Sequence, residues 1–323
     1  MTTEKLRQNT PKVRLVTVDA EQAGQRIDNF LLAQLRGVPR TLIYRILRKG
    51  EVRVNGGRVK PVYRITTGDQ VRIPPVHVDS AKTVPKPRES QLTLLQANIL
   101  FEDADLIALN KPSGMAVHGG SGVQLGVIEN LRALYPQAKR MELVHRLDRE
   151  TSGVLLIAKK TSVLRNLHEQ IRSSQMHKTY VCLVNGEVEL KKQVIDVPLR
   201  KNQLSSGERI VKVSEDGKPS ESIFLRQQVF ANFASLLEVQ LITGRTHQIR
   251  VHGQYIGHPI AGDDKYGDKS FNKTMQAYGL KRLFLHAKSL RFKHPKDQEW
   301  MTINAPLPDD LQICLKSLKG ENE

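Results

Sequence analysis

A stretch without any hydrophobic period divides this 323-residue chain into a short N-terminal part and a longer C-terminal part. From about His77 to Gln96 the sequence mixes Pro, Ser, Lys and Glu, which is the composition of an interdomain linker. A chain of this length is expected to form roughly two domains. We therefore predict an N-terminal domain in residues 1–76, a linker in residues 77–97 and a second domain in residues 98–323.

Positive charge is concentrated in the first of these domains. The chain carries 50 Lys and Arg against 33 Asp and Glu, a formal net charge of +17, and residues 1–76 alone carry 15 Lys and Arg against 6 Asp and Glu. More than half of the excess charge therefore lies in less than a quarter of the chain, which favours a nucleic acid as the partner. Binding to a membrane surface is the weaker alternative, because no helical pattern pairs a basic face with a large exposed apolar face.

The remaining composition favours a cytoplasmic protein with a packed core. Hydrophobic residues make up 39% of the chain, which is enough for a core at this length. No apolar run approaches the ~18 residues of a membrane span, and residues 1–10 lack the apolar segment of a secretory signal. Cys182 and Cys314 are not part of a CxxC pattern, which is typical of a reducing compartment without disulfides.

The basic domain has the pattern of two helices followed by a hairpin. Apolar residues recur at helical spacing from Ile27 to Leu35, and a second helix is predicted from about Pro39 to Lys49, closed by Gly50. Asn55-Gly56 then predicts a tight turn between two short strands. With its segments GQRIDNFL and LIYRILRKGEVRVNGGRV, this module closely resembles the S4 RNA-binding domain.

The resemblance to S4 domains implies which basic side chains face RNA. In that family the second helix and the turn after it present basic residues to folded RNA, and Arg side chains suit the geometry of phosphate groups. Some of these residues could instead serve only to solubilise the domain. The positions implied here are Arg40, Arg45, Arg48, Lys49, Arg53 and Arg58.

The segment LVHRLDRETSGVLLIAKK, Leu143–Lys160, carries the most chemical information in the larger domain. It predicts a charged loop, with Asp148 between Arg146 and Arg149, that leads into an apolar strand. A carboxylate flanked by two guanidinium groups stays ionised and could act as a nucleophile. On residue types alone, a surface ion pair is the simpler interpretation.

A family resemblance reverses that preference. The pattern HRLDxxTSGxxLxAK resembles the central motif of the pseudouridine synthases of the ribosomal-large-subunit type, and NKPSGMAVHGG (Asn110–Gly120) and LITGRTHQIRVHGQYIGHPIAGDDKYG (Leu241–Gly267) resemble two further motifs of that family. The resemblance implies an α+β fold with a mixed, mostly antiparallel central sheet, flanked by helices and loops. It also implies that Asp148 is the catalytic aspartate, Tyr180 the active-site tyrosine, and Arg245 the arginine that pairs with the aspartate.

The resemblance further implies the reaction and its partner. A uridine of large-subunit (23S) ribosomal RNA is flipped out of its helix, its N1–C1′ bond is broken, and the base rejoins the sugar through C5. Asp148 attacks either C1′ of the sugar or C6 of the ring, and the sequence does not decide between them. No metal and no cofactor are implied. The remaining substrate contacts implied are Arg146 in the space of the flipped nucleotide, Leu241 and Ile242 as pocket walls, and His118 and Lys111 near phosphate or as loop braces.

Alternatives remain open at this stage. Tyr180 could be an ordinary core tyrosine, and the chain could be a non-catalytic S4-type ribosome-assembly factor or a sister synthase that acts on transfer RNA. A zinc site is disfavoured, because His247 and His252 are not at the spacing of a helical zinc pair and no CxxC accompanies them. A hydrolase built on His145 is disfavoured by the lack of a GxSxG motif. We expect a monomer that acts on free ribosomal RNA or on assembly intermediates.

Overall fold

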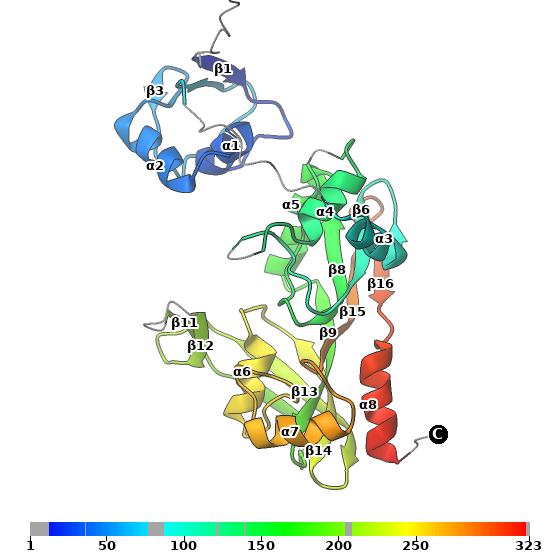
Figure 1. The fold of residues 1–323 in the computed structure, drawn as a ribbon. Coiled ribbons are helices and arrows are strands. Elements are labelled where there is room, and N and C mark those ends of the chain that lie inside the picture. Colours follow the sequence, from blue (N-terminus) through cyan, green and yellow to red (C-terminus); the bar gives the residue numbers. More distant parts are fainter. Residues whose placement is uncertain are drawn as a thin grey trace, which may run out of the picture. The chain divides into compact units, whose positions relative to one another are not determined.

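The computed structural model describes residues 13–35, 37–76, 87–120, 123–138, 140–203 and 209–320. The chain divides into two compact units, Met1–Lys86 and Pro87–Glu323 (Figure 1). Residues 89–97, which we predicted to belong to the linker, form helix α3, Glu89–Ala97, because Leu95 on this helix is fully buried in the core of the second unit. The rest of the predicted linker falls largely on residues 77–86, outside the described residues.

The N-terminal unit packs two helices against a small antiparallel sheet. Its strands follow the order β1-β4-β2-β3, and Asn55 and Gly56 in the turn between β2 and β3 both have positive φ, as the Asn-Gly pattern predicted. Isoleucine, leucine and phenylalanine side chains of both helices form one core with valines and isoleucines of the sheet. The elements are β1 (Arg14–Thr17), α1 (Ile27–Gln34), α2 (Arg40–Lys49), β2 (Arg53–Val54), β3 (Gly57–Arg58) and β4 (Gln70–Ile73).

The second unit is built on a ten-stranded sheet whose main path is β10-β13-β14-β9-β15-β8-β6-β5, with β16 paired to β15 and β7 paired to β8. All of these pairs are antiparallel except β8 with β15, which confirms the predicted mixed, mostly antiparallel sheet. Its strands are β5 (Ile99–Glu102), β6 (Leu106–Lys111), β7 (Glu142–Leu143), β8 (Ser152–Ala158), β9 (His177–Asn185), β10 (Lys192–Asp196), β13 (Glu221–Phe230), β14 (Ala234–Leu241), β15 (Leu285–Lys293) and β16 (Trp300–Asn304). A separate hairpin pairs β11 (Leu199–Gln203) with β12 (Arg209–Val213).

Helices cover this sheet, and β8 is buried on both faces. Leu155 and Ile157 of β8 belong to the core that also contains residues of α3 and α4, whereas Leu156 packs in a second core with α5. All seven residues of β8 are buried, as expected for a continuous apolar run between two layers. The helices are α4 (Val127–Leu134), α5 (Thr161–Arg172), α6 (Gln248–Tyr255), α7 (Lys269–Ala277) and α8 (Asp309–Lys319).

Gly153 fixes the place where β8 begins. It has φ 109°, and a Cβ atom on it would lie 2.2 Å from the carbonyl oxygen of Ala287 on β15. Only glycine allows this close approach of two backbones. The start of β8, and hence the loop that precedes it, is thereby held against β15.

No helix among the described residues is both long enough and apolar enough to cross a membrane.

Candidate active site

A cavity of about 580 Å³ opens where the loop before β8 faces α6. The loop between β14 and α6, the start of β9 and the end of α5 complete its wall. The residues on this wall that the sequence had assigned to the site are Arg146, Asp148, Tyr180, Leu241, Ile242 and Arg245. The structure therefore brings together, in one cavity, residues that lie about a hundred positions apart in the chain.

The side chain of Asp148 is contacted by Arg250 of α6 and by His247, the residue directly before α6. Arg250 Nη1 donates to Asp148 Oδ2 at 3.3 Å, and His247 Nε2 lies 3.8 Å from the same oxygen. Arg149, a predicted neighbour of this carboxylate, instead contacts Glu150 and the carbonyl oxygen of Gly114. The Asp148 side chain is 18% exposed, so it can be reached from the cavity.

The predicted pairing of Arg245 with Asp148 is wrong. Arg245 Nε donates to the carbonyl oxygen of Pro219 at 3.0 Å, and its backbone N–H donates to the side chain of Gln248. The arginine at the carboxylate is Arg250, in the first turn of α6. Both arginines occur in the same motif, and their spacing alone does not tell which one points at Asp148.

A second carboxylate holds Arg250 in place. Arg250 makes two hydrogen bonds to Asp263, from Nε to Oδ2 at 2.7 Å and from Nη2 to Oδ1 at 2.8 Å. Burial opposes the charge on Arg250, but the hydrogen bonds and negative charge of Asp263, together with Asp148, raise its pKa above the ordinary value. A two-point ion pair of this kind fixes the plane of the guanidinium group, and Nη1 is left to face Asp148.

Tyr180 lies in the middle of the sheet, paired with Val239 on one side and Ala287 on the other. Its side chain is buried, and burial together with the negative charge of Asp148 raises the pKa of its phenol. The phenol is therefore neutral at physiological pH. Because side chains alternate along a strand, Lys178 lies on the same face of β9 and also lines the cavity. Burial lowers the pKa of Lys178 to about 8.

Sequence reasoning missed Lys178, His247 and Arg250 as parts of this cavity. The alternation of β9 was a usable signal for Lys178, since a lysine two residues before Tyr180 shares its face of the strand. No comparable signal existed for Arg250, whose partner Asp263 follows thirteen residues later in a loop. Among the pocket walls that were predicted, Leu241 packs against the core, and Ile242 is largely exposed.

Lys111 and His118 do not line the cavity. Lys111 is fully buried, and its ammonium group donates to the carbonyl oxygens of Pro112, Met115 and Arg149 at 2.7, 2.9 and 3.0 Å. This side chain therefore braces the loop that carries Asp148, which is one of the two roles considered for it above. His118 is exposed.

The six basic residues predicted to contact RNA in the N-terminal unit are all exposed. Arg53 on β2 lies opposite Arg58 on β3 and opposite Arg72 on β4. Like charges in directly opposite positions destabilise a sheet unless a polyanion compensates them. The Arg58 side chain also packs against Gly50 at the end of α2, so the hairpin and the basic end of this helix form one continuous surface.

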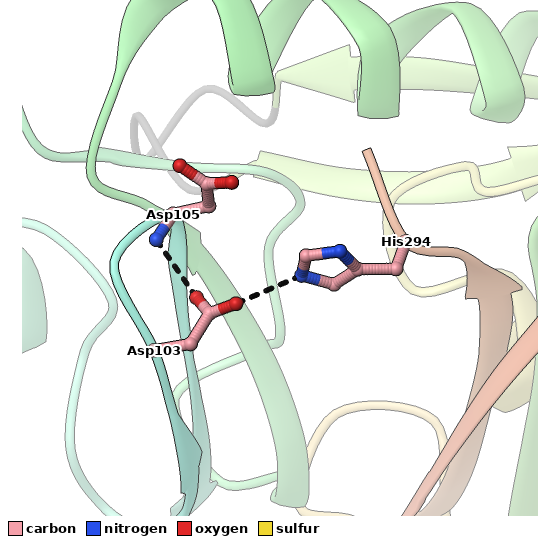
Figure 2. Close-up of side chains that lie close together, drawn as sticks. All are labelled: Asp103, Asp105 and His294. Carbon is pink, nitrogen blue, oxygen red and sulfur yellow. Dashed lines mark hydrogen bonds and ion pairs between the residues drawn. The ribbon is translucent and has the colours of Figure 1, made fainter. Parts of the chain in front are cut away.

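Asp103, Asp105 and His294 form the one group of described residues whose side chains could together hold a metal ion (Figure 2). Asp103 already accepts hydrogen bonds from the backbone N–H groups of Asp105 and Leu106, and its other oxygen lies 3.0 Å from His294 Nε2. Lys160 Nζ lies 2.6 Å from Asp105. A cation here would have to displace these partners. We therefore interpret the contact of Asp103 with His294 as a structural link between the β5–β6 turn and the residue that follows β15.

Comparison with known proteins identifies what this arrangement resembles. The family described as RNA pseudouridylate synthase matches residues 105–255, and the S4 domain matches residues 25–71. The chain is 58% identical over 308 residues to ribosomal large subunit pseudouridine synthase C of Haemophilus influenzae, with 95% of each chain covered. It is 55% identical over 318 residues to the protein of the same name from Escherichia coli strain K12, with 98% of this chain and 99% of that protein covered.

Two solved structures point to the same family. The structure of human RNA pseudouridylate synthase domain containing 4 superposes with a TM-score of 0.58 at 26% identity, and covers 71% of this chain and 96% of that one. Human RNA pseudouridylate synthase domain containing 1 gives a TM-score of 0.56 at 25% identity, over 69% of this chain and 87% of that one.

Proposed function

This chain belongs to the RNA pseudouridylate synthase family, and we propose that it isomerises specific uridines of large-subunit (23S) ribosomal RNA to pseudouridine. The relatives that share more than half of its residues carry that substrate in their names. The observation that carries the proposal is the Asp148 carboxylate, which faces a cavity while Arg250 holds one of its oxygens.

In the proposed mechanism Asp148 is the nucleophile. Its carboxylate attacks C1′ of the ribose or C6 of the uracil ring, the N1–C1′ bond breaks, and the base turns within the cavity. A bond then forms between C5 and C1′, Asp148 is released, and the proton on C5 is lost to a base while N1 gains a proton. Arg250 stabilises the ionised carboxylate at the start of the cycle and again when it is regenerated.

Four further residues on the cavity wall support this chemistry by their positions. The ring of Tyr180 can stack on the uracil, and its neutral phenol lies close to the reacting face. Arg146 is exposed at the edge of the cavity, where its side chain can fill the space of the flipped nucleotide. Leu241 and Ile242 provide apolar walls. Arg245 braces the loop before α6 through Pro219, and we assign it no contact with Asp148.

The N-terminal unit supplies affinity in this proposal. Its exposed arginines suit an RNA backbone, which proteins recognise chiefly by shape and phosphate position. We propose that the chain acts as a monomer in the cytoplasm, on free ribosomal RNA or on assembly intermediates. A synthase that acts on transfer RNA is the competing assignment, and the S4 domain favours the ribosomal substrate by family analogy alone.

The deciding experiment maps pseudouridines in ribosomal and transfer RNA from cells that lack this protein. We expect specific sites in large-subunit RNA to revert to uridine, and to be restored by the wild-type gene. The Asp148→Asn variant should bind RNA with unchanged affinity and restore none of them. Loss of sites from transfer RNA alone would contradict the assigned substrate, and restoration by Asp148→Asn would contradict the assigned nucleophile.

A further inference from the structure

His247 is a cavity residue whose hydrogen bonds determine where its proton lies. Its Nδ1 atom lies 2.8 Å from the hydroxyl oxygen of Tyr266, and the two rings meet edge to face with centroids 5.5 Å apart. On the opposite side of the ring, Nε2 lies 3.8 Å from Asp148 Oδ2. The His247 and Asp148 side chains are 17% and 18% exposed, so solvent reaches this contact only in part.

The Tyr266 hydroxyl group can be assigned as the donor to His247. Its oxygen already accepts the backbone N–H of Val211 on β12 at 2.9 Å. Its single proton has one acceptor among the described residues, which is His247 Nδ1. Burial raises the pKa of Tyr266, so the phenol keeps this proton at physiological pH.

Neutral histidine carries one ring proton, and an accepting Nδ1 places it on Nε2. That proton then faces the Asp148 carboxylate. In the reverse arrangement the lone pair of Nε2 would face the same negative oxygen, and the Tyr266 proton would have no acceptor within the described part of the chain. Both the hydrogen bonds and the charge therefore select the Nε2–H form.

The surroundings keep this imidazole neutral. Burial lowers the pKa of His247, and the positive charges that face it oppose a second proton, whereas two carboxylates favour one. Its position directly before α6, at the positive end of the helix dipole, also disfavours the imidazolium ion. The charged groups that face it are Asp148, Arg250, Lys265 and Asp263.

The backbone shows that this placement is enforced. His247 has φ 55°, a left-handed conformation that is uncommon for a residue with a side chain. The side chain of Gln248 holds the turn, because its Oε1 accepts from Thr243 Oγ1 at 2.8 Å and from the backbone N–H of Arg245 at 2.9 Å. Strain of this kind persists where the surrounding structure fixes a side chain in one place.

We propose that His247, fixed by Tyr266 as the neutral Nε2–H form, is a positioning residue that donates to Oδ2 of Asp148. This proposal rests on the nucleophilic role of Asp148 given above. Arg250 and His247 both approach Oδ2, so together they leave Oδ1 free to attack the substrate. The distance of 3.8 Å is long for a hydrogen bond in the free protein, and we expect it to shorten when RNA fills the cavity.

The proton position is tested directly by ¹⁵N NMR of histidine-labelled full-length protein. The His247 signals are assigned by their loss in the His247→Asn variant. We expect Nδ1 without a proton and Nε2 with one at neutral pH, and a mixture of the two forms in Tyr266→Phe. A proton on Nδ1 of the wild-type ring, or a doubly protonated ring, would overturn the proposal. This readout needs no substrate, so it stands even if Asp148 is not the nucleophile.

Two substitutions separate the hydrogen bond from the backbone strain. Glutamine places an amide N–H near the position of Nε2, whereas asparagine is too short but adopts the left-handed conformation more readily. We expect the single-turnover rate of His247→Gln to stay near that of the wild type and that of His247→Asn to fall about tenfold. RNA affinity should be unchanged in both variants. If asparagine preserved the rate and glutamine did not, His247 would serve the turn and not Asp148.

Discussion

At the scale of single residues, Arg250 and Arg245 lie five positions apart and have different partners. Lysine at position 250 would keep the charge but could not make two bonds to Asp263 and one to Asp148. We expect Arg250→Lys to lower the single-turnover rate by more than about tenfold. The matched variant Arg245→Lys should remain near the wild-type rate. Pseudouridine formation on a target RNA measures the rates of both variants. A larger loss in Arg245→Lys would indicate that Arg245, and not Arg250, is the arginine that acts on the Asp148 carboxylate.

Residue types and motif matches were enough to place Asp148 and Tyr180 in one cavity, but not to give each arginine its partner. The direction of Arg250 depends on where α6 begins and on Asp263, and neither is a local property of the motif. Lys111 shows the same limit. A lysine is expected near solvent or phosphate, and only the fold brings three carbonyl oxygens around its ammonium group.

At the scale of elements, the start of β8 depends on the close approach of Gly153 to β15. An added Cβ would meet the carbonyl oxygen of Ala287 at 2.2 Å, and the backbone has φ 109°. We expect Gly153→Ala to lower the free energy of unfolding of the second unit by about 3 kcal/mol. Thermal unfolding monitored by Trp300 fluorescence measures this. The control is Gly244→Ala, whose Cβ would meet only Lys178 Nζ at 3.9 Å. Equal stability of the two variants would contradict this account.

The start of α1 depends on a buried carboxylate, Asp28. It accepts two bonds from Arg26, at 3.1 and 2.7 Å, and one from the hydroxyl group of Tyr44 at 2.8 Å. Burial raises the pKa of Asp28, but these bonds outweigh it and lower the pKa below the ordinary 3.8. The stabilisation is therefore complete above the unfolded pKa and is lost as the pH falls through the lower folded value.

We expect the N-terminal unit of Asp28→Asn to be less stable than the wild type at neutral pH, with the difference shrinking under acid conditions. Hydrogen exchange of peptides from α1 and α2, followed by mass spectrometry, reports on this unit alone. Exchange in the second unit serves as the internal control. A difference between the two proteins that stayed constant down to the lowest pH would argue against the charge as its cause.

Strong periodicity decided which elements could be predicted. The apolar runs 107–109, 154–158, 180–184 and 234–241 predict strands, and the pattern of 309–318 predicts a helix. The structure has β6, β8, β9, β14 and α8 at these places. The helix α3 was missed because its sequence is mostly polar and buries only Leu95. In β15 the sequence predicts a strand only over 283–286. The second half of β15 alternates Leu290 and Phe292 with Arg291 and Lys293, and only the fold shows that the apolar pair is buried.

At the scale of the whole molecule, the net charge of +17 is distributed differently in the two units. In the N-terminal unit the exposed arginines and lysines make few ion pairs within the described residues, which suits contact with phosphate. In the second unit Lys111 is buried and holds a loop, and Arg250 and Lys178 are half-buried and line the cavity. Composition alone indicated a polyanionic partner, and it could not separate the charges that bind RNA from those that organise the site.

This division predicts how affinity depends on salt. Each phosphate contact releases counterions, so removing three of them should reduce the slope of log affinity against log salt by about 2 for single-stranded RNA. We expect this of the triple variant Arg45→Gln, Arg48→Gln and Lys49→Gln, with the turnover rate at saturating RNA unchanged. The matched control removes the same charge from exposed positions of the second unit, through Lys273→Gln, Lys316→Gln and Lys319→Gln. If both variants reduced the slope equally, RNA affinity would depend on the total charge of the protein. The N-terminal unit would then make no larger contribution to RNA binding than the second unit.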